Sequence, residues 1–354
     1  MRYGLIPDDP SEEAFLSSPI APVVMIDSFV PLIQAMSLIV GSRRGVFEGL
    51  HDGPKTVEVL AESLNVDAGT LMLLLRVLTA AGYVAQTGPG SYELSELGRT
   101  MLLEQSPARQ TAWLRVIERE WTTFQHTDEV LTTGHGIDYH AELTDADQWA
   151  DYMESMLELA RRFGPLVAAM VPVRTGAERL LDIGGSHGLF GALIARNHPP
   201  LRSEVLDLPE AVEPARKLAA AEGHDDIVTY RAGNCLVDDL GTGWDVVVLS
   251  SILHHFTPTQ IAGLLSRVRA ATTPGATVAI FELVQPDADD PPELLGDAFA
   301  LFFRLTSTGR CYTTTEYAGW LTDAGFTDVQ TQLLPMGRSL AVFSGRTPEG
   351  GTAR

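Results

Sequence analysis

The chain has 354 residues, 45% of them apolar, so it is long enough for two domains with ordinary hydrophobic cores. Its formal net charge of −21 argues against nucleic acid or an anionic membrane surface as a partner, because both attract an excess of Lys and Arg. Its two cysteines form no CxxC metal motif and no disulfide framework, and with no export signal and no run of 18 apolar residues we expect a cytoplasmic protein without a membrane span.

The first hundred residues predict a tail, a long apolar helix and a winged helix. Residues 1–22 contain four prolines and several acids and are expected to form a tail rather than a helix. Residues 26–50 are apolar on nearly every face at helical spacing, so we favour contact with a second subunit over burial within the domain. Two helices at residues 55–64 and 67–81, followed by a hairpin at 83–94, complete the winged helix.

A winged helix can bind DNA, so a regulator is the alternative function from another class. The helix at residues 67–81, in the recognition position, carries a single basic residue, Arg76, and is rich in leucine. Since DNA binding needs a basic surface, we interpret this segment as a core or dimer helix.

Residues 97–170 are expected to be helical, with breaks at Pro107 and at residues 134–136. In the long helix predicted over residues 147–170, Tyr152 and Met156 lie on one apolar face, a pattern typical of a packed core.

A strand, a glycine turn and a helix follow, which is the opening of a Rossmann-type unit. The strand is predicted over residues 179–183 and the helix from Leu189 onward. The dinucleotide motif GxGxxG does not fit, since the third position from Gly184 is Ser186. The pattern is DxGGxxG, and the Asp182 carboxylate suits a ligand with an ammonium group, such as S-adenosylmethionine (SAM).

A second acid supports this interpretation. Asp207 ends the strand predicted at residues 203–207, 25 residues after Asp182, where an acid can accept both ribose hydroxyls. An ordinary α/β turn with a solvated Asp is the alternative. The rest of the chain alternates strand and helix, as in a doubly wound sheet, and ends in two close strands that predict an antiparallel edge. The further strands are expected at residues 227–230, 245–250, 277–283, 329–334 and 339–343, and the helices after Pro258, before Leu305 and at 317–324.

These motifs resemble those of class I SAM-dependent methyltransferases that act on small molecules. The resemblance rests on residues 182–188, on Asp207-Leu208-Pro209 and on Ile252-Leu253-His254, and extends from about residue 27 to 343. Within that superfamily the chain is similar to bacterial and plant O-methyltransferases with an N-terminal dimerisation domain.

The resemblance implies an α/β fold: a seven-stranded Rossmann-like domain preceded by an all-helical, winged-helix dimerisation domain. It also implies a homodimer, SAM as cofactor with S-adenosylhomocysteine as product, and a small aromatic acceptor of secondary metabolite biosynthesis. The domain bounds that we expect are a tail at 1–22, the dimerisation domain at 23–105, a helical linker at 106–172, the SAM-binding domain at 173–346 and a tail at 347–354.

The resemblance also assigns cofactor contacts. Asn234 stands where the family usually has Asp, but its carbonyl can still accept a hydrogen bond from an exocyclic amine. Ser250 stands where many relatives have Lys. The full set of expected cofactor contacts is Asp182, Gly184, Gly185, Ser186, Gly188, Asp207, Leu208, Gly233, Asn234, Cys235, Ser250 and Met156.

His254 is the predicted catalytic base, because it follows a strand at the carboxyl edge where open sheets bind ligands. A structural role is the alternative. A metal site with His255 is disfavoured because no third ligand follows by spacing. Cys311 occupies the position of a family Glu that holds this His, and a thiol cannot replace that carboxylate. Glu282 or Asp297 could take over, and we assign Glu282 to catalysis.

The acceptor pocket is expected to involve Tyr152, Met153, Phe299, Phe303 and Cys311, with Phe302 and Met336 as further candidates. Because the usual Glu is missing, C-methylation or a SAM-assisted reaction without methyl transfer remains the alternative on the same fold.

Overall fold

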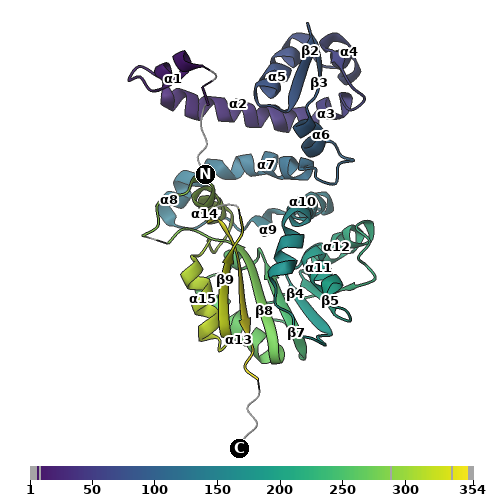
Figure 1. The fold of residues 1–354 in the computed structure, drawn as a ribbon, viewed down its shortest axis with the longest axis vertical. Helices are drawn as coiled ribbons and strands as arrows, with labels where there is room; N and C mark the ends of the chain where they lie inside the picture. Colours follow the sequence, from purple (N-terminus) through teal and green to yellow (C-terminus); the bar gives the residue numbers. More distant parts are fainter. Residues whose placement is uncertain (1–5, 8, 288, 336–337, 350–354) are drawn as a thin grey trace, which may run out of the picture. The chain divides into compact units, whose positions relative to one another are not determined.

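The computed structural model describes residues 6–7, 9–287, 289–335 and 338–349 (Figure 1). The chain divides into two compact units, with the boundary between Arg119 and Glu120. The expected tails at 1–22 and 347–354 lie partly outside the described residues, and Met336 lies wholly outside them.

The N-terminal segment corrects two expectations. Helix α1, Pro10–Leu16, forms within the segment predicted as a tail, because Asp9 caps it and Pro10 stands in the first turn, where a proline is tolerated. The single helix expected over residues 26–50 is two helices, α2 (Val23–Arg43) and α3 (Val46–Gly49). The break falls at Gly45, whose φ of 74° lies in the left-handed region that ends helices.

Apolar side chains cover much of α2 and are exposed within the single chain, among them Val24, Met25 and Phe29. By length and composition α2 is apolar enough to cross a membrane, although Asp27 and Ser28 interrupt its apolar run. Core helices of soluble proteins pass the same test, but only 11% of this apolar window is buried here.

The winged helix is present. It comprises β1 (Lys55–Thr56), α4 (Val57–Leu64), α5 (Ala68–Ala80), β2 (Val84–Gly88) and β3 (Ser91–Leu94), with strand order β1-β3-β2. Leu75 and Leu78 of α5 are fully buried in its core, whereas Leu73 on the same helix is exposed, which fits the expected core or dimer helix. Helix α6, Glu96–Leu102, closes this layer.

The helical stretch that follows contains the expected breaks. Its helices are α7 (Thr111–Thr123), α8 (Thr127–Thr133), α9 (Tyr139–Glu142) and α10 (Ala146–Met170), with a short 3-10 turn, η1 (Phe124–His126), after α7. A further break lies at Asp145, whose side chain caps α10 by accepting the Gln148 N–H.

The second unit is built on a seven-stranded sheet of order β6-β5-β4-β7-β8-β10-β9 (Figure 1). Strands β4 to β8 are parallel, and β10 runs antiparallel to both β8 and β9, which confirms the predicted edge. The strands are β4 (Arg179–Ile183), β5 (Arg202–Asp207), β6 (Val228–Ala232), β7 (Trp244–Ser250), β8 (Thr272–Leu283), β9 (Thr327–Leu333) and β10 (Leu340–Arg346).

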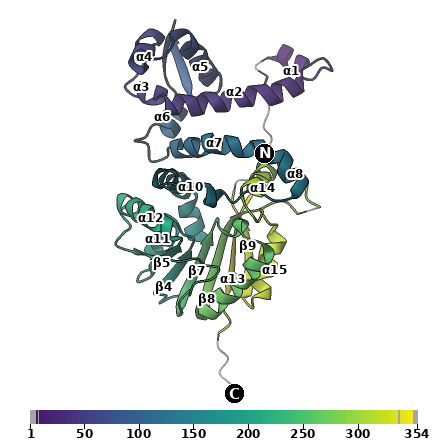
Figure 2. The same cartoon turned by 180° about the vertical axis from the view of Figure 1, so that it is seen from behind.

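Helices cover both faces of the sheet (Figures 1 and 2). Leu181 packs with the cluster that includes α13 and α15, whereas its neighbour Leu180 packs with α10 and α11. Neighbouring side chains of a strand point to opposite faces of the sheet, which explains why Leu180 and Leu181 pack in different clusters. Because both faces are covered, the parallel strands are apolar at nearly every position. The helices are α11 (Leu189–Asn197), α12 (Pro209–Ala221), α13 (Pro258–Ala271), α14 (Leu294–Thr306) and α15 (Thr314–Asp323).

Candidate active site

The glycine turn between β4 and α11 is shaped by close backbone approach. Gly184 has a φ of 64°, and a Cβ there would overlap the side chain of Ile252. A Cβ at Gly185 would overlap the Asp182 carboxyl, and Gly188, with a φ of 73°, begins α11. Glycine fits these positions without displacing a neighbour, so the main chain of the turn packs closely at the carboxyl edge of the sheet.

Asp182 lies beneath this turn rather than in solvent. Its Oδ2 accepts the Gly191 N–H at 3.3 Å, while Oδ1 is buried and has no hydrogen-bond partner among the described residues. Burial, with a smaller contribution from the Asp207 charge, raises the pKa of this carboxyl to about 7.

Asp207 links the end of β5 to the glycine turn that follows β4. Its Oδ2 accepts the Ser186 N–H at 2.8 Å and its Oδ1 accepts the Leu208 N–H at 2.8 Å, so the acid of β5 holds the glycine turn of β4. Burial raises the pKa of Asp207, opposed by these two hydrogen bonds. The Ser186 hydroxyl is buried with no partner in the described part of the chain. The two acids and the glycine turn are therefore one constellation.

The ends of β6 and β7 lie at the same edge. The Gly233 N–H donates to the Asp207 carbonyl at 2.8 Å, which places residues 233–235 next to β5. Asn234 is exposed, and its Oδ1 already accepts the Leu236 N–H at 2.9 Å. Cys235 is buried, and desolvation raises the pKa of its thiol to about 12. Ser250, at the end of β7, is buried, and its Oγ has no partner within the described residues.

His254 and Glu282 form a buried pair. His254 lies in η2 (Leu253–His255), just after β7, and its Nδ1 is 2.8 Å from Glu282 Oε2 near the end of β8. The side chains are 2% and 0% exposed. With Nδ1 bonded to a carboxylate, the ring carries its proton on Nδ1 and leaves the Nε2 lone pair available.

The other candidates for a partner of His254 do not reach it. Asp297 is exposed and accepts the Glu293 N–H at the start of α14, at 2.8 Å, which corrects the suggestion that it could hold the ring. Cys311 is fully buried and directs its thiol to the Phe299 carbonyl, at 3.9 Å. Burial, and secondarily the Glu282 charge, raises the pKa of Cys311, so the thiol stays protonated.

The loop after α14 fixes the histidine turn. A Cβ at Gly309 would overlap the carbonyl oxygens of His254 and Phe256. The Tyr312 hydroxyl donates to the Phe256 carbonyl at 2.6 Å, and the Thr308 hydroxyl donates to the His255 carbonyl at 2.9 Å. Residues 309–313, where the family usually places the Glu that holds the histidine, therefore hold the backbone of residues 254–256 in this chain.

Aromatic side chains from α14 and α10 form a wall beside His254 and its neighbours. The ring centroid of Phe303 lies 3.8 Å from that of His254, and half-buried Phe302 lies beside Phe303 at 5.2 Å. Tyr152 is half-buried on α10, and burial raises the pKa of its phenol. Met156, also on α10, is partly exposed.

Two features of this wall depart from the sequence analysis. Met153 is fully buried in the packed core with α12, so it lines no cavity, which corrects its place in the expected pocket. His140 and Trp149 belong to the wall but were not predicted, because no motif marks them; the fold places His140 against His255 and Trp149 against His140.

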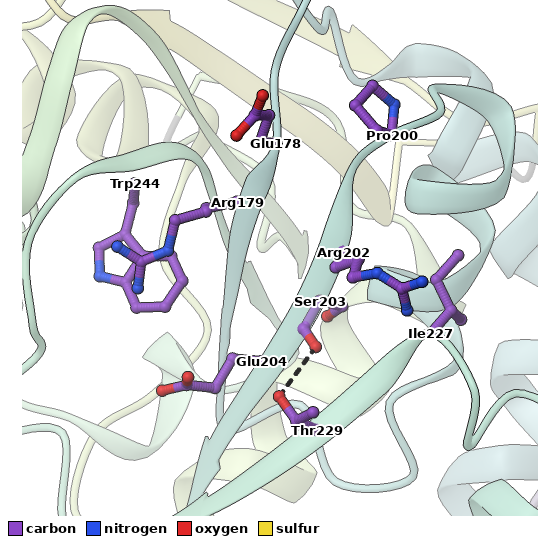
Figure 3. A pocket seen from close by; sticks show the side chains of 9 residues that line it. All are labelled: Glu178, Arg179, Pro200, Arg202, Ser203, Glu204, Ile227, Thr229 and Trp244. Atoms are coloured by element: carbon purple, nitrogen blue, oxygen red, sulfur yellow. Dashed lines mark hydrogen bonds between the residues drawn. The ribbon is translucent and has the colours of Figure 1, made fainter.

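A shallow hollow lies at the opposite, amino edge of the parallel strands (Figure 3). Arg179 stacks over Trp244 there, with its guanidinium carbon 4.1 Å from the ring centroid. Both residues begin strands, so this hollow is separate from the candidate site. No group of three or more His, Cys, Asp or Glu side chains in the described residues could hold a metal ion.

Comparison with known families decides the identity of the fold. The sequence matches the O-methyltransferase domain family over residues 119–327 and the O-methyltransferase dimerisation domain family over residues 31–104. The chain belongs to the O-methyltransferase family. It is therefore a SAM-dependent methyltransferase that carries a dimerisation domain, as the sequence motifs indicated.

Individual relatives of this methyltransferase are distant but similar over most of their length. The 3-hydroxy-5-methyl-1-naphthoate 3-O-methyltransferase of Streptomyces sahachiroi is 28% identical, covering 88% of this chain and 91% of that protein. The O-demethylpuromycin-O-methyltransferase of Streptomyces alboniger is 27% identical over 78% of this chain and 76% of its own. Human N-acetylserotonin methyltransferase in complex with SAM has the same fold, with a TM-score of 0.83 and 21% identity. The match covers 94% of this chain and 99% of the human chain.

The residues at the carboxyl edge fit SAM. The glycine turn brings the main chain to the edge of the sheet, and the Ser186 hydroxyl and Asp182 Oδ1 are buried polar atoms without a partner in the described residues. Asp207 supplies a carboxylate at the end of the neighbouring strand, where a ribose binds in this type of sheet.

Proposed function

We propose that this methyltransferase transfers the methyl group of SAM to a hydroxyl oxygen of a small aromatic acceptor of the secondary-metabolite type, with His254 as general base. The observation that carries the proposal is the buried contact between His254 Nδ1 and Glu282 Oε2, at 2.8 Å. It fixes the tautomer of the ring and leaves Nε2 to take the proton of the acceptor hydroxyl.

SAM supplies an electrophilic methyl group on a sulfonium. We propose that the glycine turn and Asp207 hold it, with Met156 and the ends of β6 and β7 completing the contacts. The proposed cofactor contacts are Asp182, Gly184, Gly185, Ser186, Gly188, Asp207, Leu208, Gly233, Asn234, Cys235, Ser250 and Met156. Asp182 supports the turn from below, since its side chain is fully buried.

His254 supplies only part of the acceleration. A phenol has a pKa of about 10 and an imidazole about 6.5, so the base alone is mismatched by several units. Holding the acceptor oxygen in line with the methyl group, between Phe303, Tyr152 and Phe299, therefore contributes most. General-base catalysis adds about 10²–10⁴-fold.

The names of relatives support an aromatic acceptor. They include enzymes that methylate a hydroxynaphthoate, in Streptomyces sahachiroi, and a phenazine, in Lysobacter antibioticus. One observation favours a second candidate: an L-tyrosine C(3)-methyltransferase of Streptomyces lavendulae is 28% identical over 222 residues, so methylation of a ring carbon is the alternative.

We infer that the enzyme works as a cytoplasmic homodimer formed largely through residues 26–100. The exposed apolar side chains of α2 and of Leu73 on α5 support this inference, because a bare surface of this kind promotes aggregation. We keep the domain bounds 1–22, 23–105, 106–172, 173–346 and 347–354 as a proposal.

Product analysis with methyl-labelled SAM tests the function. A panel of hydroxylated naphthalenes and phenazines should yield methyl ethers, located by mass spectrometry and NMR. His254→Ala should lower turnover about a hundredfold while SAM affinity by calorimetry stays unchanged. A methyl group on ring carbon establishes the alternative, and parent turnover in His254→Ala makes this histidine structural.

A further inference from the structure

Three imidazole rings lie in contact at the candidate site, of which the proposed function uses one. The ring centroids of His254 and His255 are 4.1 Å apart, and those of His255 and His140 are 4.6 Å apart. Trp149 and Tyr152 pack against the His140 end of this cluster, with the His140 ring stacked on Trp149 at 5.9 Å and edge-on to Tyr152 at 5.1 Å.

Each of the three rings leaves a nitrogen without a hydrogen-bond partner among the residues that the structure describes. His255 Nδ1 is bonded to the Ser307 hydroxyl at 2.9 Å, and its Nε2 has no hydrogen bond within the described residues. Neither nitrogen of His140 has one in the same part of the chain. Burial lowers the pKa of His140 to about 4 and lowers that of His255 well below its ordinary value, so both rings are uncharged at neutral pH.

The positions of these rings are fixed by backbone packing. A Cβ at Gly136 would overlap carbonyl oxygens of Arg304 and Ser307, and the Ile137 N–H donates to the Leu305 carbonyl at 2.9 Å. The loop before α9 is therefore held against the end of α14, beside the serine that bonds His255. A pair of rings fixed in advance is suited to orienting a ligand.

An ordinary core role does not account for the cluster. His140 and His255 are partly exposed, and none of their nitrogens is among the buried atoms that lack a partner, so the unbonded nitrogens are open to a ligand. Uncharged hydrogen-bonding groups between aromatic walls are instead typical of small-molecule sites.

Resting on the proposed function, we propose that His255, with His140 beside it, binds a second, uncharged oxygen of the acceptor on the ring carbon next to the hydroxyl that His254 deprotonates. The acceptor class is then an aromatic compound with two oxygen substituents on neighbouring carbons. Because the His254 and His255 rings are in contact, two such oxygens can each reach one imidazole. His255 is in this sense a residue that sets specificity.

Two probes that differ by one hydroxyl test the assignment: 2,3-dihydroxynaphthalene and 2-naphthol. Their dissociation constants are measured by calorimetry with the full-length enzyme saturated with S-adenosylhomocysteine. The parent enzyme should bind the diol about tenfold more tightly, the effect of one additional hydrogen bond. His255→Phe should remove this preference by weakening the diol alone, and His140→Phe should reduce it. His126→Phe, at an exposed position, is the matched control and should change neither constant.

Equal weakening of both probes by His255→Phe, or no preference in the parent enzyme, overturns the assignment. Since binding is measured without turnover, the result is separate from that of the proposed function. A diol preference that depends on His255, without methylation of either probe, supports this assignment and counts against the hydroxyl-methylating function.

Discussion

Glu282 Oε2 lies 2.8 Å from His254 Nδ1, although the two residues belong to different strand ends. Strands β7 and β8 are parallel neighbours, so their carboxyl ends meet at one edge. The other oxygen of Glu282 accepts the N–H groups of Ile252, at 2.8 Å, and Leu253, at 2.6 Å. One acid therefore fixes both the backbone of the turn and the ring, from a position unrelated to Cys311.

Glu282→Gln should lower kcat by about a hundredfold, because an amide cannot both accept these backbone hydrogen bonds and stabilise a protonated imidazole. SAM affinity should be unchanged. Steady-state kinetics and calorimetry measure the two effects. Asp297→Asn, an exposed acid on α14, is the control and should retain the parent rate. A parent-like kcat in Glu282→Gln would show that the pair is only structural.

Asp207→Ala should weaken SAM binding by about 2–4 kcal/mol, since it removes charge-assisted hydrogen bonds to the ribose and the anchor of the Ser186 N–H. Titration calorimetry gives the affinity. Glu210→Ala, an exposed acid in the first turn of α12, serves as the control. Unchanged SAM affinity in Asp207→Ala would contradict the assignment of the cofactor site.

Gly309→Ala should reduce turnover by more than tenfold, because a Cβ there displaces the backbone that carries His254. Gly263→Ala is the matched control: its Cβ meets nothing within 4 Å on the exposed side of α13, so it should stabilise the fold by about 1 kcal/mol and leave turnover intact. Thermal unfolding and kinetics on both variants separate the two effects. Parent turnover in Gly309→Ala would mean that the turn tolerates the shift.

The stability of the cofactor-free enzyme should fall with pH through Asp182. Its pKa is raised from 3.8 in the unfolded chain to about 7 in the fold, so the folded state binds the extra proton between these values. The contribution of Asp182 to stability is therefore largest below about pH 4, decreases up to about pH 7 and is level above. Melting temperatures at pH 5 and pH 8 should show a smaller loss for Asp182→Asn than for the parent enzyme. An equal loss in both would place the pH dependence elsewhere.

Disrupting the apolar surface of α2 should shift the homodimer toward monomer. The double variant Phe29→Asp, Ile33→Asp places two charges on exposed apolar positions one helical turn apart. Sedimentation velocity at micromolar concentration should show the dimer for the parent and for Leu333→Asp, an exposed position on β9. A monomeric parent protein would remove the basis for the proposed interface.

The sheet and its glycine turn were predictable because their signals are local. A buried apolar run followed by Asp182 and glycines marks a strand, a turn and a helix within about twenty residues. The break at Gly45 and helix α1 were missed because one cap residue outweighs the average pattern of a segment.

The partners in the site were less predictable because they depend on packing between distant segments. Glu282 was one of two acids considered for His254: the parallel pairing of β7 and β8 brings Glu282 to the ring, whereas Asp297 lies at the start of α14. His140 had no signal at all, since its place beside His255 depends on how the loop before α9 rests against α14.

Gly184 and Ile252 are in direct contact, so the turn that carries the cofactor acids and the turn that carries the base are packed against each other. A library designed to retarget the enzyme to new acceptors should therefore keep both turns constant as one block. Diversity belongs on α10 and α14, at Tyr152 and Phe302, which lie outside both turns, whereas Phe303 packs on the His254 ring and belongs with the block.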